Sequence, residues 1–323
     1  MKLAHPRFGY RKGLEDLGCG CFAWLQPDGS WGWSNAGLIC DGGEALLVDT
    51  LFDLNLTRDM LGAMKRASPA AAKKIGTLVN THHNGDHCYG NCLVQGAEII
   101  ASAHAKEEMT REPPALLQGF MKAAPGLGEM GAYLTHCFGA FDFNDIPQAL
   151  PTTTFTGHMT RHVGSKRVEL IEVGPAHTGG DVLVHVPDDR CVYTGDILFI
   201  EGHPIMWAGP SSNWIAACEK ILALDVETIV PGHGPITDKS GVRAVRDYLA
   251  YIRDEAKKRF DAGLSSFEAA IDISLGDYDS WGDAERIAVN VATLYREFGS
   301  TEKTPDPAEL FGRMALIWKA RRK

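Results

Sequence analysis

Long apolar runs are missing from this chain of 323 residues, in which no stretch approaches about 18 uninterrupted hydrophobic residues. The N-terminal segment Met1-Lys2-Leu3-Ala4-His5 also lacks the apolar core and the small-residue cleavage site of a signal peptide. Internal repeats and low-complexity linkers are absent, while 45% hydrophobic and 23% charged residues are typical of a globular protein. These features exclude disordered, collagen-like and coiled-coil classes and predict a chain without a membrane span.

Positive charge is in the minority, because 32 Lys and Arg face 41 Asp and Glu, giving a net charge of −9. Such a surface repels nucleic-acid phosphates and anionic membranes, so we expect neither as a partner, and a nuclease activity fits poorly. The eight cysteines of a chain without a leader predict reduced thiols and a cytoplasmic location.

Strand and helix patterns alternate through the first 240 residues, which predicts an α/β layered fold. The segments expected to be strands are 37–40, 44–49, 75–80, 97–102, 168–173, 182–186, 191–194 and 227–230. We expect one α/β layered domain over residues 1–240, with a helical insertion or lid at 103–150, where Pro and Gly interrupt a Met-rich pattern. Residues 241–323 are expected to form a C-terminal helical extension packed on the core.

A dense group of potential metal ligands follows the predicted strand 75–80. The segment Asn80-Thr81-His82-His83-Asn84-Gly85-Asp86-His87 places His82, Asp86 and His87 on one tight loop. The loop lies at the carboxyl end of a buried strand, where open α/β sheets place their sites. Imidazole nitrogen and carboxylate oxygen suit zinc or iron.

Three more strand ends each present one potential ligand beside glycine, which permits a sharp turn. They are His177 in Gly-Pro-Ala-His-Thr-Gly-Gly-Asp, Asp196 in Thr-Gly-Asp and His233 in Pro-Gly-His-Gly. A single histidine of this kind is more often structural, but four such strand ends in this order predict a metal centre.

With these motifs, residues 34–237 resemble the metallo-β-lactamase superfamily, whose first motif is His-x-His-x-Asp-His. The resemblance implies an αββα sandwich with the metal between the two sheets: one or two Zn²⁺ ions, with iron or manganese as alternatives. It implies that Asp49, at the end of Leu-Leu-Val-Asp, supports the ligands from behind. The implied ligands are His82, Asn84, Asp86, His87, His177, Asp196 and His233.

Asn84 departs from that motif, because the family usually has its second histidine there. An amide oxygen is a weaker zinc ligand than imidazole. Three outcomes follow: Asn84 coordinates through its oxygen in a dinuclear site, the first site is weak and the protein works with one metal, or His83 takes its place. The branch with His-x-Asn-x-Asp-His differs from the antibiotic-resistance enzymes, and β-lactamase activity stays among the alternatives.

The resemblance implies a hydrolase in which metal-bound hydroxide opens an ester, lactone, thioester or amide of a small, apolar substrate. Asp86 resembles the family residue that both ligates metal and orients or accepts the proton. One alternative is a mononuclear iron oxygenase similar to the persulfide dioxygenases. The other is a non-catalytic binding protein descended from an enzyme, which only Asn84 favours.

Aromatic residues suggest where the substrate binds. Trp24, Trp31 and Trp33 are expected on a glycine-containing loop at the border of the cleft, and His203 and Trp207 follow Asp196 closely. We expect Trp31, Trp33, His203 and Trp207 to line an apolar pocket. The alternative is that most of these rings are core residues.

An apolar stripe over residues 310–318 predicts that the C-terminal helix packs onto the body or onto a second subunit. The partners expected from the sequence are therefore a small-molecule substrate and, as an alternative use of this stripe, a second copy in a homo-oligomer.

Overall fold

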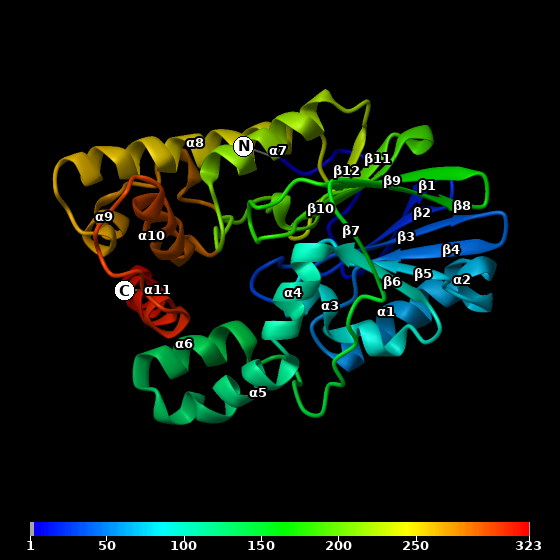
Figure 1. The fold of residues 1–323 in the computed structure, drawn as a ribbon, viewed down its shortest axis with the longest axis horizontal. Helices are drawn as coiled ribbons and strands as arrows, with labels where there is room; N and C mark the ends of the chain where they lie inside the picture. Colours follow the sequence, from blue (N-terminus) through cyan, green and yellow to red (C-terminus); the bar gives the residue numbers. More distant parts are fainter. Residues whose placement is uncertain (1–2, 323) are drawn as a thin grey trace.

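The computed structural model describes residues 3–322 and shows two β-sheets packed face to face, with helices on both outer faces (Figure 1). This arrangement confirms the αββα sandwich expected from the motifs. Within residues 3–322, none of the helices combines the length and the apolar character that crossing a membrane requires.

The first sheet holds seven strands in the order of the chain. They are β1 (Gly13–Gly18), β2 (Cys21–Leu25), β3 (Ala36–Asp41), β4 (Glu44–Val48), β5 (Thr77–Val79), β6 (Glu98–Ser102) and β7 (Thr153–Phe155). Strands β1 to β4 pair antiparallel, and β4 to β7 pair parallel. The carboxyl ends of β4, β5 and β6 therefore lie at one edge of the sheet.

The second sheet holds five strands in the order β12-β11-β10-β9-β8. They are β8 (His158–Val163), β9 (Lys166–Glu172), β10 (Val182–Val186), β11 (Cys191–Tyr193) and β12 (Thr228–Val230). Strands β8 to β11 pair antiparallel, whereas β11 and β12 pair parallel. The ends of β11 and β12 thus meet at a shared edge.

The core between the two sheets is built by alternate residues of the strands. Val48 and Ile100 from the first sheet and Val184 and Val230 from the second are all buried in one apolar cluster. Because successive side chains of a strand point to opposite faces, the intervening residues pack outward against helices.

The described part of the chain, residues 3–322, also contains eleven α-helices: α1 (Leu54–Ala67), α2 (Pro69–Lys73), α3 (Gly85–Cys88), α4 (Ala103–Arg111), α5 (Pro114–Ala123), α6 (Gly128–Phe138), α7 (Ser211–Ala223), α8 (Lys239–Asp261), α9 (Ser266–Asp272), α10 (Ile287–Glu297) and α11 (Pro307–Arg321). Helix α1 buries Met60 and Met64 against the first sheet. Helices α7 and α8 cover the outer face of the second sheet (Figure 1), and Trp214 of α7 and Val192 of β11 are buried in the same apolar cluster.

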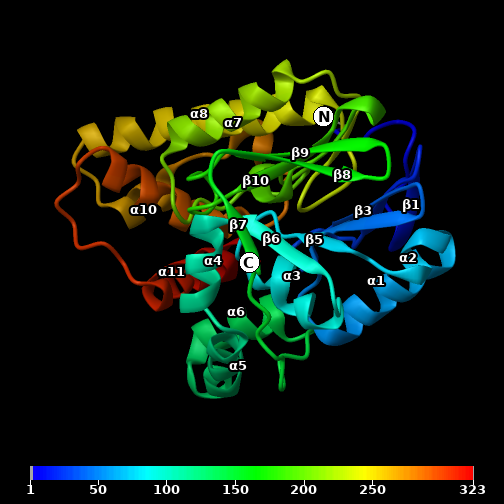
Figure 2. The same cartoon turned by 45° about the vertical axis from the view of Figure 1, so that its right-hand side comes forward.

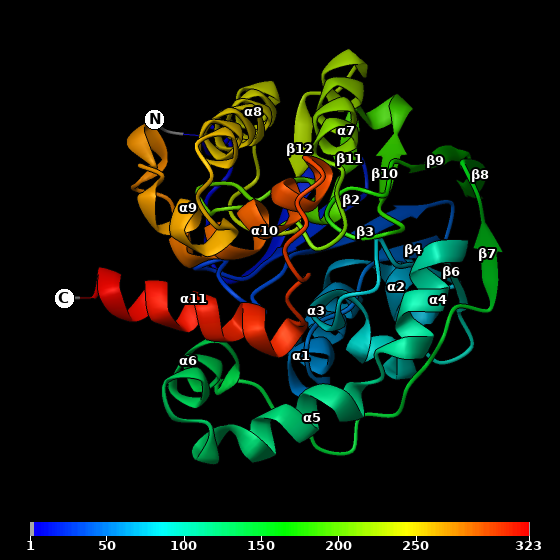
Figure 3. The same ribbon diagram turned by 60° about the vertical axis from the view of Figure 1, so that its left-hand side comes forward.

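The insertion and the C-terminal helices meet on one side of the sandwich. Helix α4 packs beside β6 and β7 (Figure 2), and α11 runs alongside α6 (Figure 3). Asp306 caps α11 by accepting from the backbone N–H of Glu309, and Ser265 and Glu268 form a capping box on α9. The division into a domain at 1–240, an insertion at 103–150 and an extension at 241–323 stays a prediction.

Four strands, β1, β2, β7 and β8, are not among the sequence predictions. Strand β8 reads His-Met-Thr-Arg-His-Val, has mostly exposed or half-buried side chains and lies at the sheet edge, so it lacks an apolar pattern. The expectation that Trp24 lies in a loop is wrong, because it is a buried residue of β2.

Candidate metal centre

The loop after β5 carries half of the centre. Asn80 anchors it, because its amide donates to the carbonyl of His87 at 3.0 Å and to Oδ1 of Asn91 at 3.1 Å. Asn84 then starts the short helix α3, which carries Asp86 and His87 in its single turn. This local fold turns His82, Asp86 and His87 toward the space between the sheets.

The second sheet supplies the other half from three strand ends. His177 follows β9, Asp196 lies in the 3-10 turn Gly195–Ile197 after β11, and His233 follows β12. Asn35 holds the last loop by donating to the carbonyls of Pro231 at 3.0 Å and Gly234 at 2.8 Å.

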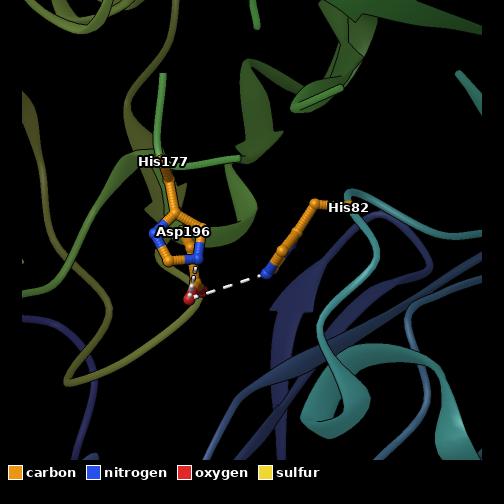
Figure 4. A group of neighbouring side chains, drawn as sticks. All are labelled: His82, His177 and Asp196. Carbon is orange, nitrogen blue, oxygen red and sulfur yellow. Dashed lines mark ion pairs between the residues drawn. The ribbon is translucent and has the colours of Figure 1, made fainter. Parts of the chain in front are cut away.

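The first group of donors consists of His82, His177 and Asp196 (Figure 4). Nε2 of His82 lies 3.7 Å from Oδ2 of Asp196, and Nε2 of His177 lies 3.3 Å from the same oxygen. Figure 4 shows the two imidazoles approaching this carboxylate from different elements. Ligands that sit about 2.0–2.2 Å from one ion are roughly 3 to 3.5 Å apart, so the three atoms can share a metal.

The second group consists of Asp86, His87 and His233. Nε2 of His233 lies 3.2 Å from Oδ2 of Asp86, and Nε2 of His87 lies 3.9 Å from it. Nε2 of His87 is also 3.1 Å from Oδ1 of Asp196, the oxygen that the first group does not use. Oδ2 of Asp196 also lies 3.5 Å from Nε2 of His233, so this carboxylate faces both groups, as a bridging ligand would.

Three buried atoms of the centre have no hydrogen-bond partner within residues 3–322: Nε2 of His82, Nε2 of His87 and Oδ1 of Asp196. Leaving a buried polar atom unpaired costs about 1–3 kcal/mol. A cation between these lone pairs would satisfy them together, so the residues present fit a divalent metal.

The tautomer of each imidazole is fixed by its Nδ1 partner. Nδ1 of His177 is 2.6 Å from the carbonyl of Ile205, and Nδ1 of His233 is 3.0 Å from the carbonyl of Gly29. A carbonyl can only accept, so Nδ1 carries the hydrogen in both rings and Nε2 of the neutral ring is left with a lone pair.

Asp49 orients the remaining two rings. Its Oδ2 accepts from Nδ1 of His87 at 2.9 Å and from the hydroxyl of Thr81 at 2.7 Å. Since that hydroxyl donates to Asp49, it accepts from Nδ1 of His82 at 3.0 Å. Burial raises the pKa of Asp49, although the His87 contact opposes this. The supporting role that the sequence predicts for Asp49 matches these contacts.

Burial also keeps two of the ligands neutral. It lowers the pKa of His177 to about 4 and holds the pKa of His82 well below its usual range. Burial alone would raise the pKa of Asp196, but the surrounding imidazoles, His233 first, hold it well below its ordinary value. At neutral pH the first group thus offers two imidazole lone pairs and a carboxylate.

Asn84 faces the first group and His83 does not. Oδ1 of Asn84 lies 2.8 Å from Nε2 of His177. The ring of His83 instead pairs with Glu108 at 3.2 Å and with Glu112 at 3.3 Å. Cys88 donates to the carbonyl of His83 at 3.1 Å, which suits a packing role for this thiol.

Two of the four expected pocket residues are buried in other contacts. Nε1 of Trp31 donates to Oε1 of Glu285 at 3.3 Å, and the guanidinium of Arg286 stacks 4.4 Å from its ring centroid. His203 is fully buried, with Nδ1 3.0 Å from the hydroxyl of Tyr248. Both belong to the packing between the sandwich and the C-terminal helices.

The other two expected pocket residues, Trp33 and Trp207, are half-buried. Trp33 packs 4.7 Å from Phe141, and Trp207 lies 6.2 Å from Phe311 of α11. The backbone N–H of Trp207 also donates to the carbonyl of His177 at 3.0 Å, so this residue lies next to a donor of the first group.

Sequence reasoning missed Asn290 of α10. Its Oδ1 accepts from the backbone N–H of Met206 at 2.7 Å, and its amide donates to the carbonyl of Pro204 at 2.8 Å. These bonds flank Ile205, whose carbonyl fixes His177. The only signal in the sequence is a polar residue within an apolar helix, and nothing there names its partners.

We compared the chain with models of protein families and with curated proteins, and the matches agree on one superfamily. The family model described as the metallo-beta-lactamase superfamily matches residues 29–233. A linear primary-alkylsulfatase from Pseudomonas sp. is 23% identical over 260 residues, which cover 71% of this chain and 48% of that protein. A hydroxyacylglutathione hydrolase from Methylococcus capsulatus is 28% identical over 169 residues, 52% of each chain. The chain spans about half the length of these curated relatives.

Solved structures share the fold at low identity. The stereoselective inverting sec-alkylsulfatase Pisa1 from Pseudomonas sp. superposes with a TM-score of 0.68 at 16% identity, covering 93% of this chain and 52% of that one. A metallo-beta-lactamase from Pontibacter korlensis gives a TM-score of 0.56 at 17% identity, covering 74% of this chain and 99% of that one.

Proposed function

This chain belongs to the metallo-β-lactamase superfamily, and we propose that it is a metal-dependent hydrolase acting on an ester, lactone, thioester or amide of a small, apolar substrate. The observation that carries the proposal is the set of four imidazoles whose Nδ1 atoms are held by acceptors while their Nε2 atoms converge on Asp86 and Asp196. Such an arrangement favours metal binding over a purely structural role, because within residues 3–322 it leaves the buried Nε2 atoms of His82 and His87 and Oδ1 of Asp196 without a hydrogen-bond partner.

Six residues would hold the metal: His82, His177 and Asp196 on one side, and Asp86, His87 and His233 on the other. A divalent ion, zinc or alternatively iron or manganese, would polarise the scissile carbonyl and lower the pKa of water at the centre. No serine or cysteine nucleophile is then needed.

Asp86 is the residue that we assign to the proton. Its side chain is 13% exposed, against 4% or less for the three imidazoles and the carboxylate paired around it. Its Oδ2 lies 3.2 Å from Nε2 of His233, and its backbone carbonyl accepts from the hydroxyl of Ser34 at 2.6 Å. The carboxylate is therefore fixed in position and still open toward an incoming substrate, where it can orient water and accept its proton.

The chemistry named by the relatives guides the choice of substrates. Because the matches include an alkylsulfatase and hydroxyacylglutathione hydrolases, an alkyl sulfate and a hydroxyacylglutathione join aryl esters and lactones in a first panel. We expect turnover of at least one ester-type substrate by protein loaded with metal.

The variants Asp86→Ala and His177→Ala test the role of the centre. Each should lower kcat/KM by about 10³-fold or more while the circular dichroism spectrum stays that of the wild type, because the ligand set is broken without loss of core packing. His104→Ala is the control, since this ring is exposed and pairs with Glu172 at the surface, away from the centre.

Two results would contradict the proposal. One is wild-type turnover by either ligand variant. The other is a protein that holds a single iron, consumes oxygen with a thiol substrate and hydrolyses nothing on the panel, which would favour the oxygenase alternative.

A further inference from the structure

The two donor groups differ in charge. Asp196 faces both groups, so it does not distinguish them. The second group adds the carboxylate of Asp86, whereas the first adds only the neutral amide of Asn84. Attraction for a divalent cation grows with the ligand charge, so the two positions cannot bind a metal equally well.

The contact between Asn84 and His177 is not an ordinary hydrogen bond. Nδ1 of His177 gives its hydrogen to the carbonyl of Ile205, so Nε2 of the neutral ring has none to donate to Oδ1 of Asn84 at 2.8 Å. Two lone pairs facing each other at this distance repel. The same separation is close to that of two adjacent ligands on one ion, for which about 3 Å is usual.

The neighbouring histidine cannot take over this role. His83 is buried between Glu108 and Glu112, which hold its two ring nitrogens. Turning this ring to the metal would break its ion pairs with both carboxylates. Asn84 is thus the residue of the loop that completes the first group.

We infer that Asn84 ligates through Oδ1 and that the centre binds two ions of unequal affinity, a resident ion at Asp86, His87 and His233 and an exchangeable ion at His82, Asn84 and His177. The inference rests on the proposed metal-dependent function and adds to it the order in which the positions fill. Activity then depends on free metal concentration over a range in which the resident ion stays bound.

Metal binding to the full chain tests the inference directly. Protein stripped with a chelator is titrated with Co²⁺ followed by visible absorption, and bound metal is counted by elemental mass spectrometry after equilibrium dialysis. The wild type should bind two ions in separate phases, at least about tenfold apart in Kd.

Substitutions at residue 84 identify the weaker phase. Asn84→Ala should lose it and keep one ion, with the Kd of the tighter phase unchanged. Asn84→Asp should tighten the weaker phase, because it restores an oxygen and adds charge. Asn144→Ala serves as the control, since this exposed loop amide hydrogen-bonds Asp142 and Gln118 and not the centre.

Each outcome decides the question. Two ions with wild-type affinities in Asn84→Ala would overturn ligation by Asn84, and two indistinguishable affinities in the wild type would overturn the unequal positions. A wild type that saturates with one ion would overturn the exchangeable position while leaving a one-metal hydrolase. A wild type that binds no metal would instead overturn the proposed function itself.

Discussion

The carboxylate of Asp196 sits in a space that only a neighbouring glycine permits. A Cβ at Gly232 would lie 1.9 Å from Oδ1 of Asp196 and 2.7 Å from the backbone carbon of Gly195. Gly195 itself has a φ of +50° and faces Thr81, the residue that connects His82 with Asp49. The bridging position therefore depends on two glycines as well as on the ligands.

Gly232→Ala should displace Asp196 and lower bound metal at least about tenfold. The added methyl group would clash with the Asp196 carboxylate and with the backbone of Gly195, and that backbone cannot move aside as a flexible side chain would. Elemental analysis of the purified variant measures this. Gly202→Ala is the matched control, since nothing lies within 4 Å of a Cβ there. Equal metal content in Gly232→Ala and Gly202→Ala would contradict the close approach of residue 232 to the Asp196 carboxylate.

For single residues, the sequence predicts which side chains gather at the centre, but it does not predict the residues that hold them in position. His82, Asp86 and His87 could be placed together because they share one short loop. Asn290 could not, because the contact that it makes joins residues 84 positions apart. The positions of the tryptophan side chains are also not predictable, since the sequence pattern does not distinguish a buried Trp31 from a tryptophan that lines a pocket.

Among the elements, α10 has the most direct effect on the centre. Asn290 holds the backbone on both sides of Ile205, and the Ile205 carbonyl sets the ring of His177. Thr293, one turn further on, donates to the carbonyl of Met206 at 2.8 Å. Helix α10 thus holds residues 204–206 where the carbonyl of Ile205 can accept from His177 of the first group.

Asn290→Leu removes both bonds and leaves Pro204 and Met206 with unpaired buried backbone groups. We expect a 10- to 100-fold weaker first metal position, the usual cost of losing a residue that orients a ligand, with about 1–3 kcal/mol lost in stability. Metal titration and urea unfolding measure the two effects. Asn55→Leu, at an exposed helix position, should change neither; a full metal content in Asn290→Leu would show that Ile205 keeps its place without help.

His203, in the segment after Asp196, contacts Tyr248 of α8, and its burial there predicts that the stability of the protein depends on pH. Burial and the nearby Arg286 lower the pKa of His203 to about 3, against about 6.5 in an unfolded chain. Because the folded-state pKa is lowered, this stabilisation is complete above pH 6.5 and is lost as the pH falls toward 3, by up to about 1.4 kcal/mol per pH unit.

His203→Gln isolates this contribution. Between pH 7 and pH 5, the free energy of unfolding of the wild type should fall by roughly 2 kcal/mol more than that of His203→Gln, as followed by urea denaturation. His104→Gln, at an exposed ring, provides the reference. Parallel pH profiles for the wild type and His203→Gln would mean that His203 takes up its proton over the same pH range in the folded and unfolded states, and would contradict a lowered pKa.

The strands that carry or precede the ligand motifs are predictable from the sequence, whereas β1 and β8, at the sheet edges, are not. Strands β5, β6, β10 and β12 are apolar runs that end in turns, so they were predicted close to their true bounds. Strands β1 and β8 alternate weakly because much of their surface is exposed, and their pairing is decided by tertiary contacts.

For the whole molecule, the centre joins two halves that meet at this edge through apolar packing and through hydrogen bonds such as those of Asn35 to the carbonyls of Pro231 and Gly234. His82, Asp86 and His87 come from the first sheet, and His177, Asp196 and His233 come from the second. Metal shared between them would act as a cross-link between the two sheets. Binding to the folded state alone stabilises a protein by about 2.7 kcal/mol when the ligand is at a hundred times its Kd.

Removing the metal should therefore lower the melting temperature of the whole protein. Differential scanning calorimetry with and without EDTA measures the shift, which readdition of the ion should reverse. Asp196→Ala, which lacks the bridging carboxylate, should melt at the same temperature in both conditions. A wild-type Tm that does not respond to EDTA would argue against a cross-link between the sheets.

The bonds from α10 to the segment around Ile205 also affect how genes of this kind are interpreted. A coding sequence cut after codon 240 would still contain every histidine and aspartate of the centre, and a motif search would count it as intact. Its product would lack Asn290, so the carbonyl that aligns His177 would have no anchor. A survey that asks whether such a gene is functional should therefore score the helix that follows the last histidine together with the ligands.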